Sequence, residues 1–447
     1  MTAPLEAGLE ACGRRLSALS AAPLATAFSG GGDSLFLMLV ARVFAERSGR
    51  RLIALHVDHG LQAQSGAWAA EAQAVAAKLG IDCRILRWDG AKPSTGLPAA
   101  ARAARHRLIA DAAREAGAQV VLLGHTLDDQ LENAVMRGAG APVGALGEWA
   151  ISPAWPQGRG LYHCRPLLAV RRAALRDELA ARGLDWLDDP ANEDLRYARA
   201  RARRAVAGGT RGVLPPPADL TDLAAICRFT PWGGLDLDRA RLLEAEPARA
   251  LRLLQIALAC ASGVQRLARP GRAAGLLARL ADGERFIATL AGARIEAGDE
   301  VRLSREAGEA DRGGLESMIL APGRTAVWDG RFEIAVDEPG WRVEALRGQA
   351  SRLGPADSAR LRDIPAFVRP SLPALRSGKG LRSSVHLALV GKGDHIGVIG
   401  ASLRALSQDR FVGAIGLVTK EDEIGTFARM ANSPPPPYVG VEARTNE

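Results

Sequence analysis

Long apolar runs are missing from this 447-residue chain. No stretch reaches the roughly 18 apolar residues that a membrane-spanning helix needs. The N-terminal segment MTAPLEAGLEACGRRLSAL also lacks the continuous apolar core behind a basic start that marks an export signal. The sequence therefore predicts a cytoplasmic protein with no membrane contact.

Cysteine is scarce as well. The five cysteines are widely spread, and no two of them form a Cys-x-x-Cys pair. This spacing argues against zinc ribbons, iron–sulfur clusters and disulfide scaffolds, and it fits a reducing compartment.

Lysine supplies only five of the 58 basic residues, so arginine carries most of the net charge of +8. Codon bias in a GC-rich genome explains arginine in place of lysine, but it does not explain the positive balance. The segment RYARARARRAVAGGTR (196–211) holds six arginines and no acid. Composition alone leaves two interpretations open for it, phosphate contacts or a solvated helix face.

The first part of the chain alternates short apolar runs with helix-length segments. Apolar runs at 24–28, 51–57, 83–88 and 119–125 read as buried strands, and the segments between them read as helices that close on glycine. This alternation predicts an α/β fold with a doubly wound parallel sheet. Ligands of such sheets bind beyond the carboxyl ends of the strands.

Proline and glycine mark the expected domain boundaries. We expect a catalytic domain over 1–214, ending at the proline-rich VLPPPADL, and a helical domain over 219–290. Turns of the Gly-Asp and Asp-Gly type then predict hairpins in a β-rich C-terminal domain over 291–430. The proline-rich residues 431–447 are expected to form a flexible tail.

The first predicted strand runs into a glycine-rich loop made of Ser29, Gly30, Gly31, Gly32, Asp33 and Ser34. Glycine amides and the positive end of the next helix suit an anion of pyrophosphate size. The loop lacks the lysine of a Walker A motif, and a plain turn capped by Asp33 is the alternative. The order Ser-Gly-Gly-x-Asp-Ser resembles the PP-loop of ATP pyrophosphatases, which implies cleavage of ATP between the α and β phosphates. An acid in the place of the lysine can hold Mg2+ against these phosphates.

Two further strand ends carry candidate functional residues. In GHTLDDQLEN, His125 ends a strand, and Asp128, Asp129 and Glu132 share the start of a helix, where a metal ion or an ammonium would satisfy the acids. The alternative is that the acids only complement the helix N-terminus.

In LHVDHGLQ, His56 and Asp58 share one face of a strand and His59 lies on the other, so a wall of the nucleotide pocket is favoured over a metal triad. In AARAARHRL, Arg102 and Arg105 lie one helix turn apart and suit either a solvated face or the charge of an adenylate.

Six ordered motifs between residues 22 and 212 resemble the tRNA(Ile)-lysidine synthetase family. They are SGGGDS, LHVDHGL, ARAARHR, GHTLDDQLEN, RPLL and WLDDPANEDLRYARARAR. The resemblance implies that ATP adenylates C2 of the wobble cytidine in tRNA(Ile) with a CAU anticodon, and that free L-lysine then displaces AMP. It also implies that the β-rich C-terminal domain contacts tRNA.

The resemblance assigns roles by motif position. The loop Ser29–Ser34 and His56 would bind ATP, with Asp33 on Mg2+, while Arg105 and His125 would stabilise the adenylated base. Asp129 and Glu132 would receive the lysine. Arg199 and Arg203 would contact tRNA or substrate.

Three positions depart from the family pattern: His106 replaces a usual Tyr, Asn133 a Thr and Ala200 an Asn. A cytidine thiolase of the PP-loop group, a small-molecule amide synthetase and an RNA-binding module with an inactive nucleotide pocket are kept as alternatives. The sequence leaves the oligomeric state open, with a homodimer as one option.

Overall fold

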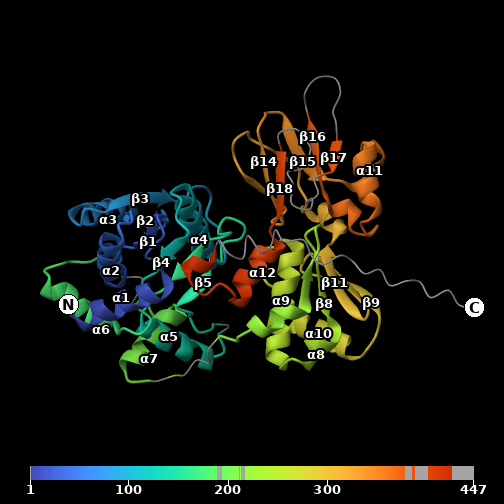
Figure 1. Cartoon of the computed structure of the whole chain (residues 1–447). Helices are drawn as coiled ribbons and strands as arrows, with labels where there is room; N and C mark the ends of the chain where they lie inside the picture. The colour runs from blue at the N-terminus through green and yellow to red at the C-terminus, as the bar shows by residue number, and fades with distance from the viewer. Residues whose placement is uncertain are drawn as a thin grey trace, which may run out of the picture. The chain divides into compact units, whose positions relative to one another are not determined.

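The computed structural model describes residues 2–141, 143–188, 194–210, 212, 217–377, 385–387 and 401–424. The expected tail at 431–447 and residues 213–216 of the proline-rich boundary lie outside these residues. The chain forms two compact units, and each is described by itself (Figure 1). Unit 1 comprises Met1–Thr221 together with Gly416–Ile424, and unit 2 is built on Asp222–Ile415.

Unit 1 contains a sheet of six strands in the order β3-β2-β1-β4-β6-β5. All neighbours pair in parallel except the edge strand β5, which is antiparallel to β6. The strands are β1 (Leu24–Ala27), β2 (Leu52–Asp58), β3 (Asp82–Arg87), β4 (Val120–Leu122), β5 (Trp149–Ile151) and β6 (Tyr162–Cys164). This topology confirms the predicted doubly wound sheet; the three-residue strand β5 was not predicted, because so short a run carries no readable period.

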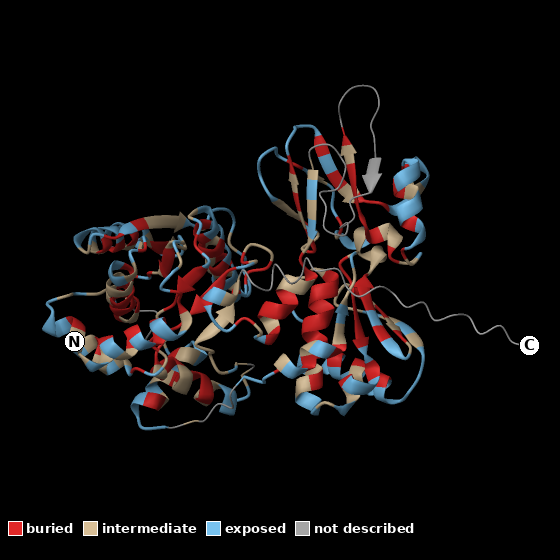
Figure 2. Ribbon diagram, in the orientation of Figure 1, coloured by how far each residue is buried: buried red, intermediate tan, exposed pale blue. Residues whose placement is uncertain are grey.

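Helices cover both faces of the sheet, and each face has its own apolar core. One core joins β1 to α1, α2, α3 and α6, and the other joins β2 and β4 to α4. In Figure 2 the central strands of this sheet are mostly buried, whereas the edge strands β3 and β5 are mostly of intermediate burial. The helices are α1 (Ala3–Arg15), α2 (Gly32–Ser48), α3 (Ser65–Lys78), α4 (Leu97–Glu115), α5 (Leu127–Gly138), α6 (Arg172–Ala181) and α7 (Ala198–Ala207).

The strand order reverses between β1 and β4. From β1 the chain proceeds to β2 and β3 on one side, and β4 and β6 lie on the other. A ligand crevice forms outside the carboxyl ends of the strands at such a reversal. The loop after β1 and the loop after β4 are therefore the first places to look for a site.

Residues 416–424 return from the C-terminal part of the chain and pack in unit 1. Glu421 is buried there and accepts two hydrogen bonds from the buried guanidinium of Arg50, at 2.7 and 2.8 Å. Its second oxygen also accepts the backbone N–H of Ser17 at 2.9 Å. The sequence placed these residues in the C-terminal domain, because nothing local marks a segment that packs against a distant part of the chain.

Unit 2 joins a five-stranded antiparallel sheet to helices and to two smaller sheets. The largest buried helix is α9, where most side chains are buried against α10, α12 and the sheet. The first sheet and its helices are β7 (Cys227–Phe229), β8 (Leu235–Asp238), α8 (Arg239–Glu244), α9 (Pro247–Ser262), α10 (Pro270–Ala281), β9 (Phe286–Leu290), β10 (Ala293–Ala297) and β11 (Glu300–Arg305).

The remaining strands form the sheets β12-β15-β16-β17 and β13-β14-β18. Their bounds, with the last two helices, are β12 (Met318–Ile319), β13 (Ala326–Trp328), β14 (Phe332–Val336), β15 (Trp341–Ala345), α11 (Pro355–Arg362), β16 (Pro373–Ser377), β17 (Val385–Leu387), β18 (Ala401–Ala405) and α12 (Ser407–Ile415).

Both predicted hairpins are present, as β10–β11 and β13–β14. The segment expected to be helical, 219–290, also contains the strands β7, β8 and β9, which belong to the same sheet as the first hairpin. Among the described residues, no helix is long and apolar enough to cross a bilayer.

Candidate active site

The glycine-rich loop between β1 and α2 is braced by its two serines. The hydroxyls of Ser29 and Ser34 lie 3.0 Å apart, and Ser34 Oγ donates to the carbonyl of Gly31 at 2.8 Å. The helix α2 begins at Gly32 directly behind this loop. The positive end of a helix therefore lies where the sequence predicted a phosphate cradle.

Two glycines allow other chain segments to approach this loop closely. Gly30 has a φ of +89°, and a Cβ there would lie 2.7 Å from Leu187 Cδ1. A Cβ on Gly124, after β4, would lie 3.0 Å from the carbonyl oxygen of Asp33. Glycine at 124 thus brings the loop of His125 against the loop of Asp33, as expected at the reversal of strand order.

His56 lies beside the glycine-rich loop, on β2. Its Nδ1 is 3.0 Å from the carbonyl oxygen of Phe28, the residue before Ser29. Burial lowers the pKa of this imidazole. His59 instead packs edge-on against Trp88, with 6.0 Å between ring centroids. The two histidines therefore have different neighbours, which fits the predicted pocket wall better than a shared metal.

The acids at the start of α5 have a structural role, as the alternative interpretation stated. Asp129 Oδ2 accepts the backbone N–H of Thr126 at 2.7 Å, which is half of a capping box. Asp128 Oδ2 accepts the backbone N–H of Arg172 at 2.7 Å, at the first turn of α6. Helix capping accounts for these two contacts but not for the remaining carboxylate oxygens.

Those oxygens meet arginines in a group that we call the carboxylate cluster. Arg172 joins three of its acids: Nε donates to Asp33 Oδ2 at 2.8 Å, Nη1 to Glu132 Oε1 at 2.9 Å and Nη2 to Asp129 Oδ1 at 3.2 Å. The cluster consists of Asp33, Asp128, Asp129, Glu132, Arg171, Arg172, Arg199 and Arg203. The glycine-rich loop and the acids of α5 are thus parts of one site.

Two arginines of α7 complete the cluster. Arg199 donates to Glu132 Oε2 at 2.9 Å and to Asp129 Oδ1 at 2.6 Å, while Arg203 donates to Glu132 Oε1 at 3.0 Å. Glu132 is fully buried and so receives three guanidiniums. Burial raises the pKa of Asp129, but Arg199, the Thr126 N–H and Arg172 outweigh burial and the net pKa is lowered.

A second group of side chains, the histidine–arginine cluster, lies at and beyond the ends of β4 and β6. It consists of Arg102, Arg105, His106, His125, His163 and Arg165. The rings of His106 and His163 stack with 5.6 Å between centroids. Burial, followed by repulsion from Arg105, lowers the pKa of His106 to about 3. Burial also lowers the pKa of Arg105 and of Arg165 to about 10.

The structure places the three departures from the expected pattern. His106 is buried in the stack with His163, and Asn133 Nδ2 donates to the carbonyl of Gly144 at 3.1 Å. Ala200 is buried on α7, which packs on α5. Each departure therefore lies in protein packing.

One carboxylate oxygen of Asp33 is available for the expected Mg2+ ion. Asp33 Oδ1 is buried and makes no hydrogen bond, while Asp33 Oδ2 is held by Arg172. Burial raises the pKa of this carboxyl, and Arg172 opposes the rise. Among the described residues, no three His, Cys, Asp or Glu side chains converge as a metal site would require. A single free carboxylate oxygen fits Mg2+ bound mainly by phosphate oxygens and water.

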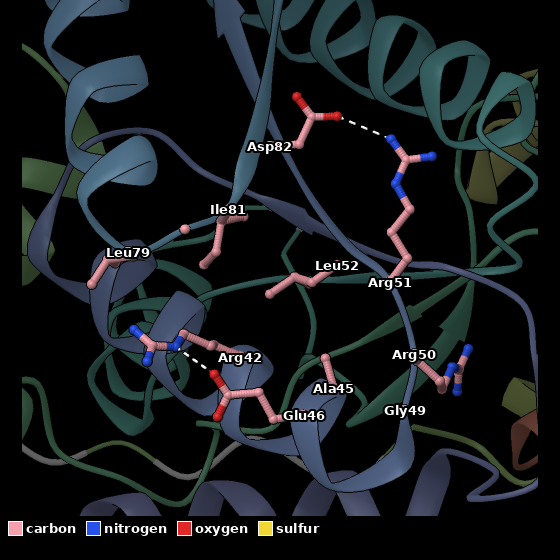
Figure 3. Close-up of a pocket in the computed structure, with 11 residues that line it drawn as sticks. Arg42, Ala45, Glu46, Gly49, Arg50, Arg51, Leu52, Leu79, Ile81 and Asp82 are labelled. Carbon is pink, nitrogen blue, oxygen red and sulfur yellow. Dashed lines mark hydrogen bonds and ion pairs between the residues drawn. The ribbon is translucent and has the colours of Figure 1, made fainter.

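A cavity of about 430 Å³ lies at the amino ends of the strands, opposite the carboxyl ends that carry the candidate site (Figure 3). It is lined by residues at the end of α2 and just before β2 and β3, including Arg42, Glu46, Arg51 and Asp82. Its charged side chains are paired: Arg42 with Glu46 and Arg51 with Asp82, as Figure 3 shows, and Arg50 with Glu421. Because it opens at the amino ends of the strands, this cavity is separate from the candidate site.

The sequence did not single out Arg172, Arg165 or His163. Arg165 belongs to the RPLL motif, and Arg172 is the second residue of the Arg-Arg pair that starts α6. A signal was present for Arg172, since a basic residue at a helix N-terminus opposes the helix dipole and needs an acidic partner. His163 carries no such signal, because it sits inside a three-residue apolar strand.

Comparison with known proteins assigns the first half of the chain. A family model described as a PP-loop domain matches residues 10–208. A tRNA(Ile)-lysidine synthase from Caulobacter vibrioides is 48% identical over 422 residues, covering 91% of this chain and 97% of that protein. A protein of the same name from Mesorhizobium japonicum is 39% identical, covering 70% and 72%.

Among solved structures, a U34-tRNA thiolase from Methanococcus maripaludis matches with a TM-score of 0.39 and 16% identity, covering 46% of this chain and 73% of that one.

Proposed function

The chain belongs to the tRNA(Ile)-lysidine synthase family, and we propose that it joins free L-lysine to C2 of the wobble cytidine in tRNA(Ile) with a CAU anticodon. It is an ATP-dependent enzyme of the PP-loop group that forms lysidine. The observation that carries the proposal is the single site in which Arg172 links the glycine-rich loop to the acids of α5. We place the reaction in the cytoplasm; a homodimer remains an expectation.

The proposed reaction has two steps. In the first, the C2 oxygen of cytidine attacks the α-phosphorus of ATP, and pyrophosphate leaves from the loop Ser29–Ser34. In the second, the ε-amine of lysine attacks C2, the C2–O bond breaks and AMP leaves. The lysine ammonium loses one proton before its nitrogen attacks and another as the C2–N bond forms, so it needs proton acceptors close by.

The adenylation step is assigned to the glycine-rich loop and its neighbours. The loop's serines and helix N-terminus suit pyrophosphate, and His56 lines the strand beside it. Mg2+ would bind the free oxygen of Asp33 and neutralise phosphate charge. Arg105 and His125 would stabilise the negative charge that develops on the adenylate.

The lysine step is assigned to Asp129 and Glu132. The carboxylate cluster contains four acids and four arginines, so a further ammonium binds only if a guanidinium leaves. We infer that Arg199 or Arg203 leaves, because their side chains are 41% and 34% exposed, whereas that of Arg172 is 13% exposed and has three acidic partners. The displaced arginine is then free to contact tRNA or the substrate.

The cysteines do not favour the cytidine thiolase alternative. Burial raises the pKa of Cys12 and Cys260 to about 12, so these thiols are inert rather than poised to carry sulfur. All five cysteines are free and none pairs with another.

Lysine incorporation tests the proposal directly. Purified full-length protein with tRNA, ATP and Mg2+ should transfer labelled lysine to tRNA(Ile) and release AMP. Asp33→Asn should lower the rate at least about 1,000-fold, because adenylation loses its metal ligand. Glu46→Gln, an exposed acid in an ion pair, serves as the matched control and should retain activity. Absence of labelled lysine in tRNA with wild-type protein would refute the proposed function.

We further propose that unit 2 contacts tRNA phosphates through arginines at and before the start of α10. Arg266, Arg269 and Arg272 are exposed, and residues 264–281 contain no acid. Removal of everything after Pro215 would be a poor test, because it also removes Glu421 and leaves the buried guanidinium of Arg50 without its carboxylate. Substitutions avoid this difficulty.

The triple variant Arg266→Gln, Arg269→Gln, Arg272→Gln should weaken tRNA binding and reduce the slope of log affinity against log salt by roughly two to three. A control triple at Arg285, Arg312 and Arg347, each of which pairs with a carboxylate, should change the slope less. Equal slopes for the two triples would contradict a role for α10 in phosphate binding.

A further inference from the structure

Four buried nitrogen atoms in the histidine–arginine cluster have no hydrogen-bond partner. They are His106 Nε2, His125 Nδ1, His163 Nδ1 and Arg165 Nε. His163 is 1% exposed, and His106 and Arg165 are each 8% exposed. Buried polar atoms are normally satisfied, and four exceptions in one place indicate a missing ligand.

The chemistry of these atoms defines the ligand. Arg165 Nε always carries a proton, so its partner must be an acceptor. The surroundings are basic: Arg102 and Arg105 both repel charge on His106, and Arg105 does the same to His163. Asp129 acts on His125, but it is itself held by Arg172 and Arg199. An anionic oxygen therefore fits, whereas a neutral carbonyl would leave the charges unbalanced.

The place of the cluster narrows the ligand to the substrates of this site. His163 is in β6, Arg165 follows it, and His125 follows the neighbouring strand β4, so these side chains lie at and just beyond the carboxyl ends of adjacent parallel strands. The pyrophosphate loop follows β1, on the other side of β4. An oxygen bound beside β6 thus belongs to a group other than the pyrophosphate.

We propose that Arg165, His163 and His106 bind an anionic phosphoryl oxygen of the substrate, behind Arg105 and His125. This inference rests on the proposed function, which supplies two sources for the oxygen. One is the phosphate of the adenylate, which leaves as AMP. The other is a phosphodiester that flanks the wobble cytidine in tRNA. Both sources present the same chemistry to the cluster.

Calorimetric titration of the full chain with AMP and, separately, with the trinucleotide UpCpA distinguishes the sources. Arg165→Gln should weaken at least one of these probes about tenfold, since a charge-assisted hydrogen bond is lost. The probe that weakens identifies the source. Arg107→Gln, an exposed arginine next to His106 in α4, removes the same charge and should leave both affinities unchanged.

A second variant separates binding from folding, because Arg165 Nη1 also donates to the carbonyl of Gly147 at 2.8 Å. His163→Gln leaves that hydrogen bond in place and should weaken the same probe several-fold. The inference is overturned if neither probe binds wild-type protein, or if both variants bind both probes as wild type does.

Lysine incorporation by the wild-type protein, measured in parallel, tells the two proposals apart. If wild-type protein forms lysidine but both variants bind AMP and UpCpA as tightly as wild type does, this inference alone fails. Protein that binds AMP through Arg165 and transfers no lysine would remove the proposed function alone.

Discussion

The two halves of the candidate site differ in how their charges are satisfied. In the carboxylate cluster every acid contacts at least one arginine, and Glu132 contacts three. In the histidine–arginine cluster, four buried nitrogen atoms have no partner, and the guanidinium of Arg102 repels those of Arg105 and Arg165. One half holds its own counter-ions, and the other half lacks them.

This difference indicates what each half does when substrate arrives. Replacing one cation by another in the carboxylate cluster leaves the charge balance unchanged, so lysine can exchange with an arginine at little electrostatic cost. The histidine–arginine cluster instead gains an anion, which attracts each of its guanidiniums and offsets the repulsion between them. We therefore expect the protein without substrates to be stable at the first half and electrostatically strained at the second.

Removal of the most heavily paired acid should give the largest effect on stability. Glu132→Gln keeps the shape of the side chain but leaves three guanidiniums facing a neutral group. The free energy of unfolding should fall by roughly 3 to 5 kcal/mol, as for other buried ion pairs that lose one partner. Lysine transfer to preformed adenylated tRNA should slow at least about 100-fold, since the proposed ammonium site is lost.

Chemical denaturation and single-turnover transfer measure these two effects. Glu178→Gln provides the control, because Glu178 pairs only with Arg182 on the same helix and should change stability by about 0.5 kcal/mol or less. Unchanged lysine transfer in Glu132→Gln would exclude this residue from the lysine site.

Much of the first half of the site could be predicted from the sequence, because its residues belong to contiguous motifs at strand ends. Asp33 lies in a loop whose three consecutive glycines indicate a tight turn around an anion. Asp129 and Glu132 share one helix face. What no local pattern contained was the arginine that connects them. Arg172 is 139 residues from Asp33 along the chain, and their contact depends on the packing of α6 against α2.

The second half was less predictable for a similar reason. His106 and His163 belong to α4 and β6, and each alone resembles an ordinary buried histidine. Only the order β1-β4-β6 brings them together. In unit 2 the hairpins were readable from their turns, whereas β7 and β8 were missed, because strands of three or four residues carry too little periodicity.

Acidification should lower the free energy of unfolding through the histidine–arginine cluster. The pKa of His106 is about 3 in the folded protein and near 6.5 when unfolded, so the unfolded state takes up more protons between these values. The contribution of neutral His106 to the free energy of unfolding is complete above pH 6.5 and declines as the pH falls toward 3. Between pH 7 and pH 5 the loss should be about 2 kcal/mol for His106 alone.

Urea denaturation at both pH values measures this loss. His106→Gln should reduce the difference in unfolding free energy between pH 7 and pH 5 by a similar amount. His59→Gln is the control, since His59 is less buried and lies against Trp88 rather than in the cluster. A pH dependence that is the same in wild type and His106→Gln would show that this imidazole is not held neutral by its surroundings.

Arg172→Gln is expected to displace the pH profile of adenylation, and this shift tests whether the two steps of the reaction share a residue. This guanidinium opposes the burial that raises the pKa of Asp33, so Arg172→Gln should raise that pKa further. The acid limb of tRNA-dependent ATP–pyrophosphate exchange should therefore move to higher pH, because ionised Asp33 is the form that binds Mg2+. Arg171→Gln is the matched control: Arg171 is half exposed and pairs with Asp128 alone. If the acid limb stays in place in Arg172→Gln, the contact between Arg172 and Asp33 has no influence on adenylation, and the glycine-rich loop works independently of the acids on α5.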